Sequence, residues 1–389
     1  MDFNFSDDQN SLRDAVAKWV EKGFDFPRRH ALAKAGGKTR AVYVELAELG
    51  LIGLAIPEAH GGMGFGATEA MVVMEELGRG LVNAPFAAAA LVVPTLLSAA
   101  PDALQAAWLP KIATADALVV PALQERGARY QINQVTTTAT ASANQSAHPS
   151  ASPSSTGWTL NGQKSVVPAA DEADAFIVPA RLSGAAGDCA GIGLFLVEKG
   201  AAGVKVTGYQ TQDGGRAGEL MLDNAAASLI TADGFALLEQ AVDVGIAATC
   251  AEGVGLMDKM LAVTVEYMNT RKQFGATLAS FQALRHRIAD VKMAVELGRS
   301  MSFFASLKLG EAPAQRRRSL SQAKVQLGRS MRQVGQDCTQ IHGGIGVTDE
   351  YISSHYFKRL TMLEMAYGDT QHHLGEVAER MQDTAGVFA

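Results

Sequence analysis

Two segments that lie far apart in the chain carry residues suited to binding an anion. The first covers residues 271–275 (Arg-Lys-Gln-Phe-Gly), and the second covers residues 340–346 (Gln-Ile-His-Gly-Gly-Ile-Gly). Arginine presents a planar fork of donors to phosphate oxygens, and glycine lets the backbone approach a ligand closely. Backbone amides without a helical partner bind phosphate in a similar way. Together the two segments predict a site for a pyrophosphate group.

Each segment alone also fits an ordinary helix end. Apolar residues recur with helical spacing from Ala241 to Met268, so Arg271 would follow a helix C-terminus, where cations are favoured. Glycines after a second helical run can likewise form a simple turn. In this alternative interpretation Arg271 is a capping cation and Phe274 is a core aromatic residue.

In combination, the two segments resemble the signature of the acyl-CoA dehydrogenase family. Its members carry Arg-x-x-Phe-Gly-x-x-(Leu/Ile)-x-x-Phe-Gln, then His-x-x-Ala-Asp, and later Gln-x-x-Gly-Gly-x-Gly. The matching positions here are Arg271, Phe274, Gly275, Leu278, Phe281, Gln282, His286, Ala289, Asp290, Gln340, Gly343, Gly344 and Gly346. The resemblance extends over nearly the whole chain, and within the family it points to the small-subunit branch typified by pimeloyl-CoA dehydrogenase.

This resemblance implies FAD as the cofactor, with a dimer mate completing the adenosine–pyrophosphate part of its site. The two segments are then expected to meet across a protomer boundary. Arg271 would pair with the pyrophosphate, and Phe274 would pack near the adenosine. The residues expected to bind the cofactor are Arg271, Gln273, Phe274, Leu278, Gln340, Gly343 and Gly344. The resemblance also implies an acyl-CoA substrate and an electron-transfer flavoprotein as electron acceptor.

The catalytic base is where this sequence departs most from the family. The family reaction removes a proton α to the thioester and a hydride from the β carbon, and a buried carboxylate suits the proton step. In most members that carboxylate is a glutamate at the position of Tyr367, and in others at that of Gly245. A phenol is acidic only near pH ~10, so Tyr367 is a poor base at neutral pH.

Glu252 is the remaining candidate for the base. It lies two helical turns beyond Gly245 on the same face of the expected helix. Residues 246–256 are otherwise small and mostly apolar, so a charge among them would be costly to bury without a purpose. The alternative interpretation is that Glu252 pairs with another helix. Glu364, which we expect to meet a basic neighbour, and Asp369 are weaker candidates.

The loop expected to contact the flavin has changed. The family sequence Thr-Glu-Pro-Gly-x-Gly-Ser-Asp is replaced by residues 122–129 (Ala-Leu-Gln-Glu-Arg-Gly-Ala-Arg). The later motif Trp-x-x-x-Gly-x-Lys is present as Trp158, Gly162 and Lys164. Val166 and Pro168 replace the usual aromatic residue and threonine, although backbone groups can still bind a ring edge. His372 and His373 lack a third ligand, so we expect them to be solvated or near the cofactor, not to bind metal.

The elements that position these residues follow the order helices, strands, helices. We predict an α+β fold with an N-terminal helical domain (1–115), a small antiparallel β domain (116–225) and a C-terminal four-helix bundle (226–389). The expected long helices are Leu237–Asn269, Leu284–Leu309 and Ser319–Ile341, and the expected strands are Ala117–Leu123, Trp158–Leu160, Ala175–Pro179, Ile192–Val197 and Val204–Val206. Residues 136–156 are nearly all Thr, Ser, Ala and Pro, which predicts a mobile surface loop.

Composition narrows the class of protein. The chain has 389 residues, a net charge of −6, 48% hydrophobic residues and a mean hydropathy of +0.06. This balance predicts a globular cytoplasmic protein and argues against nucleic-acid or membrane partners. The dispersed cysteines (Cys189, Cys250 and Cys338) predict neither disulfides nor zinc. Bundle helices of this length often continue into a subunit interface, so we expect a dimer or tetramer.

Three functions remain open at this stage. The first is an FAD-dependent acyl-CoA dehydrogenase that forms a trans-2-enoyl-CoA and passes electrons to an electron-transfer flavoprotein. The second is a catalytically impaired small subunit that completes the FAD site of a hetero-oligomer with a large acyl-CoA dehydrogenase subunit. The third is a flavin oxidase or monooxygenase on the same scaffold, although no residue here supplies an oxygen-activating group. No side chain indicates the length of the acyl chain.

Overall fold

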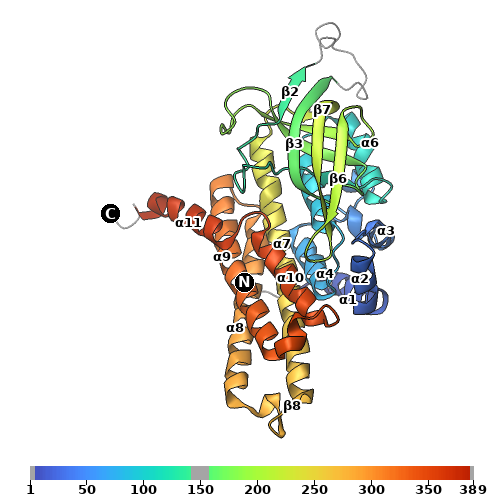
Figure 1. The fold of residues 1–389 in the computed structure, drawn as a ribbon. Helices are drawn as coiled ribbons and strands as arrows, with labels where there is room; N and C mark the ends of the chain where they lie inside the picture. Colours follow the sequence, from blue (N-terminus) through green and yellow to red (C-terminus); the bar gives the residue numbers. More distant parts are fainter. Residues whose placement is uncertain (1–4, 142–156, 386–389) are drawn as a thin grey trace. The chain divides into compact units, whose positions relative to one another are not determined.

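The computed structural model describes residues 5–141 and 157–385 (Figure 1). The chain divides into two compact units. The helical unit comprises Met1–Ala31, Ala67–Val82 and Ile246–Ala389, and the sheet unit comprises Leu32–Gly66 and Asn83–Gly245. The fold is the α+β arrangement expected from the sequence, with helical N-terminal and C-terminal parts and a β part between them along the chain.

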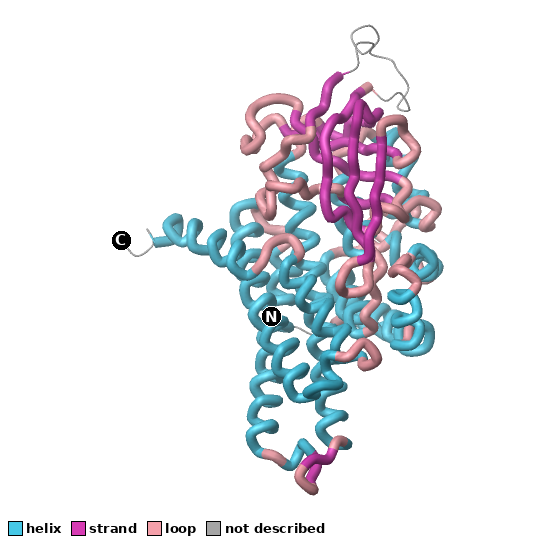
Figure 2. The backbone as a smooth tube through the Cα atoms, viewed as in Figure 1, coloured by secondary structure: helices cyan, strands magenta, loops and turns pink. Residues whose placement is uncertain are grey.

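The helical unit is built around one long helix, α9. Helices α8, α10 and α11 all pack on α9, and α1 packs on α4. The long helices predicted from hydrophobic spacing are present with slightly different ends. The elements are α1 (Asp7–Gly23), α2 (Phe26–Lys34), α4 (Ala67–Arg79), α7 (Phe235–Thr270), α8 (Gln282–Lys308), α9 (Pro313–His342), α10 (Ile352–Met365) and α11 (Thr370–Ala385). Figure 2 shows the short hairpin of β8 (Lys272–Gln273) and β9 (Ala276–Thr277) joining the ends of α7 and α8.

In the described residues, the sheet unit forms one sheet of seven strands. Six of them follow the order β1-β4-β2-β3-β7-β5, and the seventh, β6, pairs with β7. β4 also pairs with β5. The pairings are antiparallel except those of β1 and β2 with β4. The strands are β1 (Val119–Pro121), β2 (Thr138–Ala141), β3 (Trp158–Pro168), β4 (Ala175–Arg181), β5 (Ile192–Glu198), β6 (Val204–Gln210) and β7 (Arg216–Thr231). The unit's helices are α3 (Arg40–Glu48), α5 (Val93–Leu97) and α6 (Asp102–Ala113).

Two strands of the sheet unit were not predicted from the sequence. β2 falls inside the segment 136–156, so a mobile loop is wrong for residues 138–141, while residues 142–156 lie outside the described part of the chain. β7 is the longest strand, yet it contains Gly, Asp, Asn and a run of Ala, which strands disfavour. It forms because three neighbouring strands, β3, β5 and β6, pair with it. Tertiary pairing overrides the local preference of these residues.

A buried arginine organises the loops beside the sheet. Arg181 ends β4 and is 7% exposed. Its guanidinium donates to four backbone carbonyls: those of Asn133 (2.9 Å), Ala186 (2.8 Å), Asp188 (2.9 Å) and Ala190 (2.7 Å). Buried carbonyls need such donors when no ladder partner is available. Arg181 is therefore a structural cation of the sheet unit.

No helix in the described part of the chain is long and apolar enough to cross a membrane. The three cysteines are free: Cys250 and Cys338 are buried, and Cys189 is exposed. Burial raises the pKa of the Cys250 thiol to about 12, so this thiol is protonated and unreactive at neutral pH.

Helices α4 and α7 cross at two glycines. A Cβ atom built on Gly255 would lie 1.9 Å from the Glu75 carbonyl oxygen, and one on Gly78 would lie 2.3 Å from that of Glu252. This close approach lets Arg79 of α4 pair with Asp258 of α7. Because backbone atoms cannot move aside as a flexible side chain can, only glycine fits at these positions.

We expect Gly255→Ala to lower the free energy of unfolding by about 1–3 kcal/mol through overpacking. Alanine alone would favour the helix by about 1 kcal/mol, so the sign of the change tests the crossing. Gly375→Ala, inside α11, is the control, because a Cβ there meets nothing within 4 Å. Urea unfolding followed by circular dichroism gives the comparison. Equal or greater stability of Gly255→Ala than of the control would contradict the close approach.

Candidate functional site

The segment with Arg271 forms an exposed hairpin. α7 ends at Thr270, and the turn places Phe274 (φ 53°) and Gly275 (φ 79°) in the left-handed region. Phe274 is 94% exposed and touches only the edge of the Phe281 ring among the aromatic contacts of the described residues. The alternative interpretation, in which Phe274 is a core aromatic residue, is therefore wrong. Arg271, Lys272 and Gln273 are also exposed, and Leu278 is partly buried.

The glycine segment leaves its backbone open. α9 ends at His342, and Gly343 follows in the left-handed region with φ 64°. A Cβ at Gly343 or Gly344 would meet nothing within 4 Å, and Gln340, one turn earlier, is exposed. A bound group can thus approach the main chain at both glycines, as a phosphate requires. Beside an exposed arginine, these residues fit the pyrophosphate end of a dinucleotide.

Three rings bring the two helix ends together. The His342 ring lies 4.6 Å from the Tyr267 ring and 5.1 Å from the Tyr351 ring, centroid to centroid. The Tyr267 hydroxyl also donates to the His342 carbonyl at 3.4 Å. Tyr267 is one helical turn before Arg271, and His342 directly precedes Gly343. The helix ends that carry the two segments therefore meet within one chain. The expected meeting across a protomer boundary stays a prediction.

In the sheet unit, the altered loop 122–129 is anchored through Glu125. Its carboxylate accepts hydrogen bonds from Lys164 Nζ (2.6 Å), Thr137 Oγ1 (2.7 Å) and the backbone amides of Thr136 (2.7 Å) and Thr137 (3.0 Å). Burial opposes the charge, but these donors outweigh it and lower the pKa of Glu125 to about 2. Burial lowers the pKa of Lys164 to about 8. The sequence motif pointed to Lys164 but did not predict Glu125 as its partner.

Beyond this anchor, the end of β3 is tied to the altered loop. The Ser165 amide donates to the Gln124 carbonyl at 2.8 Å, which ties the altered loop to the strand. Val166 adopts φ 54° and is 48% exposed. The Glu219 carboxylate accepts from Ser165 Oγ at 2.7 Å. The loop has lost the family side chains, yet its backbone is held in place.

Glu252 is buried and already paired. It is 6% exposed, and its Oε1 accepts from Nε of Arg359 on α10 at 2.6 Å. This is the partner on another helix that the alternative interpretation expected. Burial, and next the negative charge of Glu252, raise the pKa of Tyr367 to about 12. Tyr367 is therefore a protonated phenol at neutral pH and can donate a hydrogen bond there but not accept a proton.

The other polar residues near Tyr367 have structural partners. Glu364 accepts from the backbone amide (3.0 Å) and hydroxyl (2.6 Å) of Thr370, which begins α11, and pairs with the expected basic neighbour, Arg332, at 3.5 Å. His373 is fully buried, so it is not solvated, and the alternative expectation that it lies near the cofactor stays a prediction. Burial lowers the pKa of His373 to about 2, so its ring is neutral at physiological pH.

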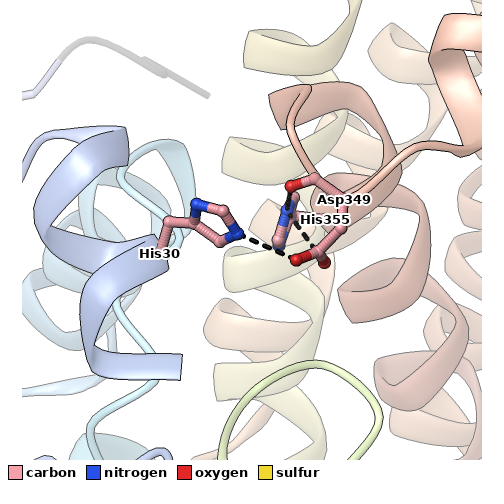
Figure 3. Close-up of side chains that lie close together, drawn as sticks. All are labelled: His30, Asp349 and His355. Carbon is pink, nitrogen blue, oxygen red and sulfur yellow. Dashed lines mark hydrogen bonds and ion pairs between the residues drawn. The ribbon is translucent and has the colours of Figure 1, made fainter. Parts of the chain in front are cut away.

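A separate cluster joins α2 to the start of α10 (Figure 3). His30 Nε2 lies 2.8 Å from Asp349 Oδ2, and His355 Nε2 lies 2.7 Å from the Asp349 carbonyl oxygen. These groups lie close enough to hold a metal ion together. However, Arg29 donates to Nδ1 of His355, so Nε2 carries the proton, and Lys358 adds a second positive charge 3.4 Å from Asp349. The surroundings favour an ion-pair network over a dication.

Three sequence models of one family match the chain: the acyl-CoA dehydrogenase N-terminal domain (residues 6–116), middle domain (122–225) and C-terminal domain (232–382). A glutaryl-CoA dehydrogenase of Desulfococcus multivorans is 26% identical over 395 residues, covering 95% of each chain.

Two solved structures have the same fold over nearly the whole chain. One is the glutaryl-coenzyme A dehydrogenase glutaryl-CoA complex, with 25% identity, a TM-score of 0.87, and coverage of 98% of this chain and 97% of that one. The other is a variant of the Tcur3481-Tcur3483 steroid ACAD, with 27% identity, a TM-score of 0.84, and coverage of 97% and 99%. The chain therefore belongs to the acyl-CoA dehydrogenase family, whose members are FAD-binding flavoproteins.

Proposed function

We propose that this chain takes part in the α,β-dehydrogenation of an acyl-CoA thioester to the trans-2-enoyl-CoA, with electrons passed to an electron-transfer flavoprotein. FAD, when bound, supplies the acceptor for the hydride from the β carbon. The observation that carries the proposal is the contact of Tyr267 with His342, which sets an exposed arginine hairpin beside an open glycine backbone. That pairing suits a dinucleotide, and the family membership of the chain supports the reaction.

Cofactor binding is proposed for Arg271, Gln273, Phe274, Leu278, Gln340, Gly343 and Gly344. Arg271 supplies the charge for the pyrophosphate, and the two glycines supply backbone contacts without steric conflict. Phe274, at the tip of the hairpin, is exposed enough to pack on a ring of the same ligand.

We expect Arg271→Met to weaken FAD binding by about 10- to 100-fold, since a hydrogen bond to a charged group contributes about 1.5–3 kcal/mol. Lys272→Met is the matched control, because it removes the adjacent and equally exposed cation of the same hairpin. Titration of deflavinated protein with FAD, followed by flavin fluorescence, measures both affinities. If Arg271→Met binds FAD as tightly as the control does, the pyrophosphate assignment is wrong.

Glu252 is the proposed base for the proton α to the thioester. It is the carboxylate whose charge raises the pKa of Tyr367, the residue at the usual catalytic position. Its bond to Arg359 occupies Oε1 and leaves the second oxygen to take a proton. The ion pair between Glu252 and Arg359 must persist during the proton transfer. The assignment therefore requires the Glu252 carboxylate to accept a proton while it is bound to a guanidinium.

A second candidate is a small subunit without a base of its own, which completes the FAD site of a larger acyl-CoA dehydrogenase subunit. Two observations favour it: the phenol at position 367 keeps its proton at neutral pH and so cannot act as a base, and the Glu252 carboxylate is held by an arginine.

Anaerobic mixing of the flavin-loaded protein with a panel of CoA thioesters separates the candidates. With Glu252 as base, the flavin absorbance bleaches, and Glu252→Gln slows bleaching by at least about 100-fold, the usual contribution of a positioned base. Glu266→Gln, an exposed carboxylate on the same helix, is the control and should bleach normally. Unchanged bleaching of Glu252→Gln would remove the base assignment. Bleaching only in a complex with a larger subunit would establish the second candidate.

A further inference from the structure

The turn between α10 and α11 holds Tyr367 in an unusual backbone conformation. Its φ of 56° lies in the left-handed region, which a bulky residue adopts only at a cost of about 1–3 kcal/mol. The next residue, Gly368, also has a positive φ, of 115°. Such a turn persists only when its surroundings determine it, so the contacts around it identify what holds the tyrosine.

Lys324 supplies the largest set of these contacts. It lies in the middle of α9, is fully buried, and donates from Nζ to the carbonyls of Leu363 (3.0 Å), Glu364 (2.8 Å) and Gly368 (2.9 Å). Three ammonium hydrogens thus meet three backbone oxygens. Two of these oxygens belong to the last turn of α10, where a positive charge also complements the helix dipole. The third belongs to the residue directly after Tyr367.

Burial lowers the pKa of Lys324 to about 8, so the group is still mostly charged at neutral pH and keeps all three donors. A buried ammonium is costly unless it is fully hydrogen-bonded. A methionine of similar length would fill the same space without any polar atom. The lysine is therefore better explained by the carbonyls it holds than by the packing of α9.

The same face of α9 contacts the turn at two further positions. Ser321 lies 3.2 Å from Nδ1 of His373, whose Nε2 lies 3.1 Å from the Tyr367 carbonyl oxygen. A Cβ on Gly328 would lie 2.2 Å from the Thr370 hydroxyl. Residues 321, 324 and 328 share one side of the helix, so α9 offers a continuous surface on which the turn rests.

We propose that Lys324 is a positioning residue for Tyr367, acting through the backbone carbonyls on both sides of it to fix where its side chain points. The geometry is independent of any ligand. Its meaning for catalysis rests on the proposed function, because position 367 is where a side chain of this family acts on the acyl group. In this chain, Lys324 would orient a hydrogen-bond donor at that place.

The test labels the protein with 3-fluorotyrosine and follows Tyr367 by fluorine NMR, with Tyr367→Phe assigning its resonance. We expect Lys324→Met to broaden the fluorine resonance of Tyr367 and to shift its chemical shift toward that of a mobile tyrosine. Arg181→Met is the matched control, since it removes another buried cation that donates to backbone carbonyls, but in the sheet unit. The control should leave the Tyr367 resonance unchanged even though it also loses stability.

Turnover provides the second readout. In whichever assembly oxidises an acyl-CoA, Lys324→Met should lower kcat by about 10- to 100-fold with little change in KM or flavin content, as expected for a misplaced group. An unchanged Tyr367 resonance in a folded Lys324→Met protein would overturn the proposal. If the Lys324→Met variant does not fold, amide hydrogen exchange of the wild-type protein provides the test. The amides of residues 366–370 must be protected from exchange, and fast exchange there overturns the proposal. Failure of the wild type to bind FAD, both alone and together with a larger subunit, would instead refute the proposed function.

Discussion

A buried charge must be compensated, and this constraint shapes the parts of the candidate site around Glu125, Glu252 and Lys324. Lys164 is fully buried because Glu125 accepts from it, and Glu252 is buried because Arg359 donates to it. Lys324 is compensated in another way, by three main-chain oxygens that accept from its ammonium group. An uncompensated charge would cost several kcal/mol, which is a large part of the stability of a domain. Each charge therefore requires that its partner stay in place.

These compensated charges determine which chemistry remains available near position 367. A phenol whose pKa is raised to about 12 keeps its proton, and the neighbouring carboxylate is held by a guanidinium. The sequence resemblance implies a glutamate at the corresponding position in most members of the family. The present chain has replaced it with a donor while keeping a well-held turn. A site that can orient a thioester but gains little from its own base is consistent with both candidate functions.

The dinucleotide part of the site follows a different principle. It uses helix ends, where main-chain groups lack helical partners, together with residues that leave the main chain accessible. Gly343 and Gly344 are exposed, and Phe274 protrudes from its hairpin because no element of the helical unit covers it in the described chain. The three rings of Tyr267, His342 and Tyr351 are the rigid part, and they set the two exposed segments beside each other.

The sequence alone determined the features that depend on local order. Hydrophobic spacing located the long helices, short runs rich in Val, Ile and Thr located five of the strands, and spaced motifs identified the family and its cofactor. The contacts that give Glu252, Glu125 and Lys324 their roles could not be predicted, because each joins residues from different elements. β7 was missed for the same reason, since its pairing comes from strands elsewhere in the chain. Local sequence decides what a segment can form; only the tertiary structure decides which buried groups meet, because compensation of a charge depends on distance in space and not along the chain.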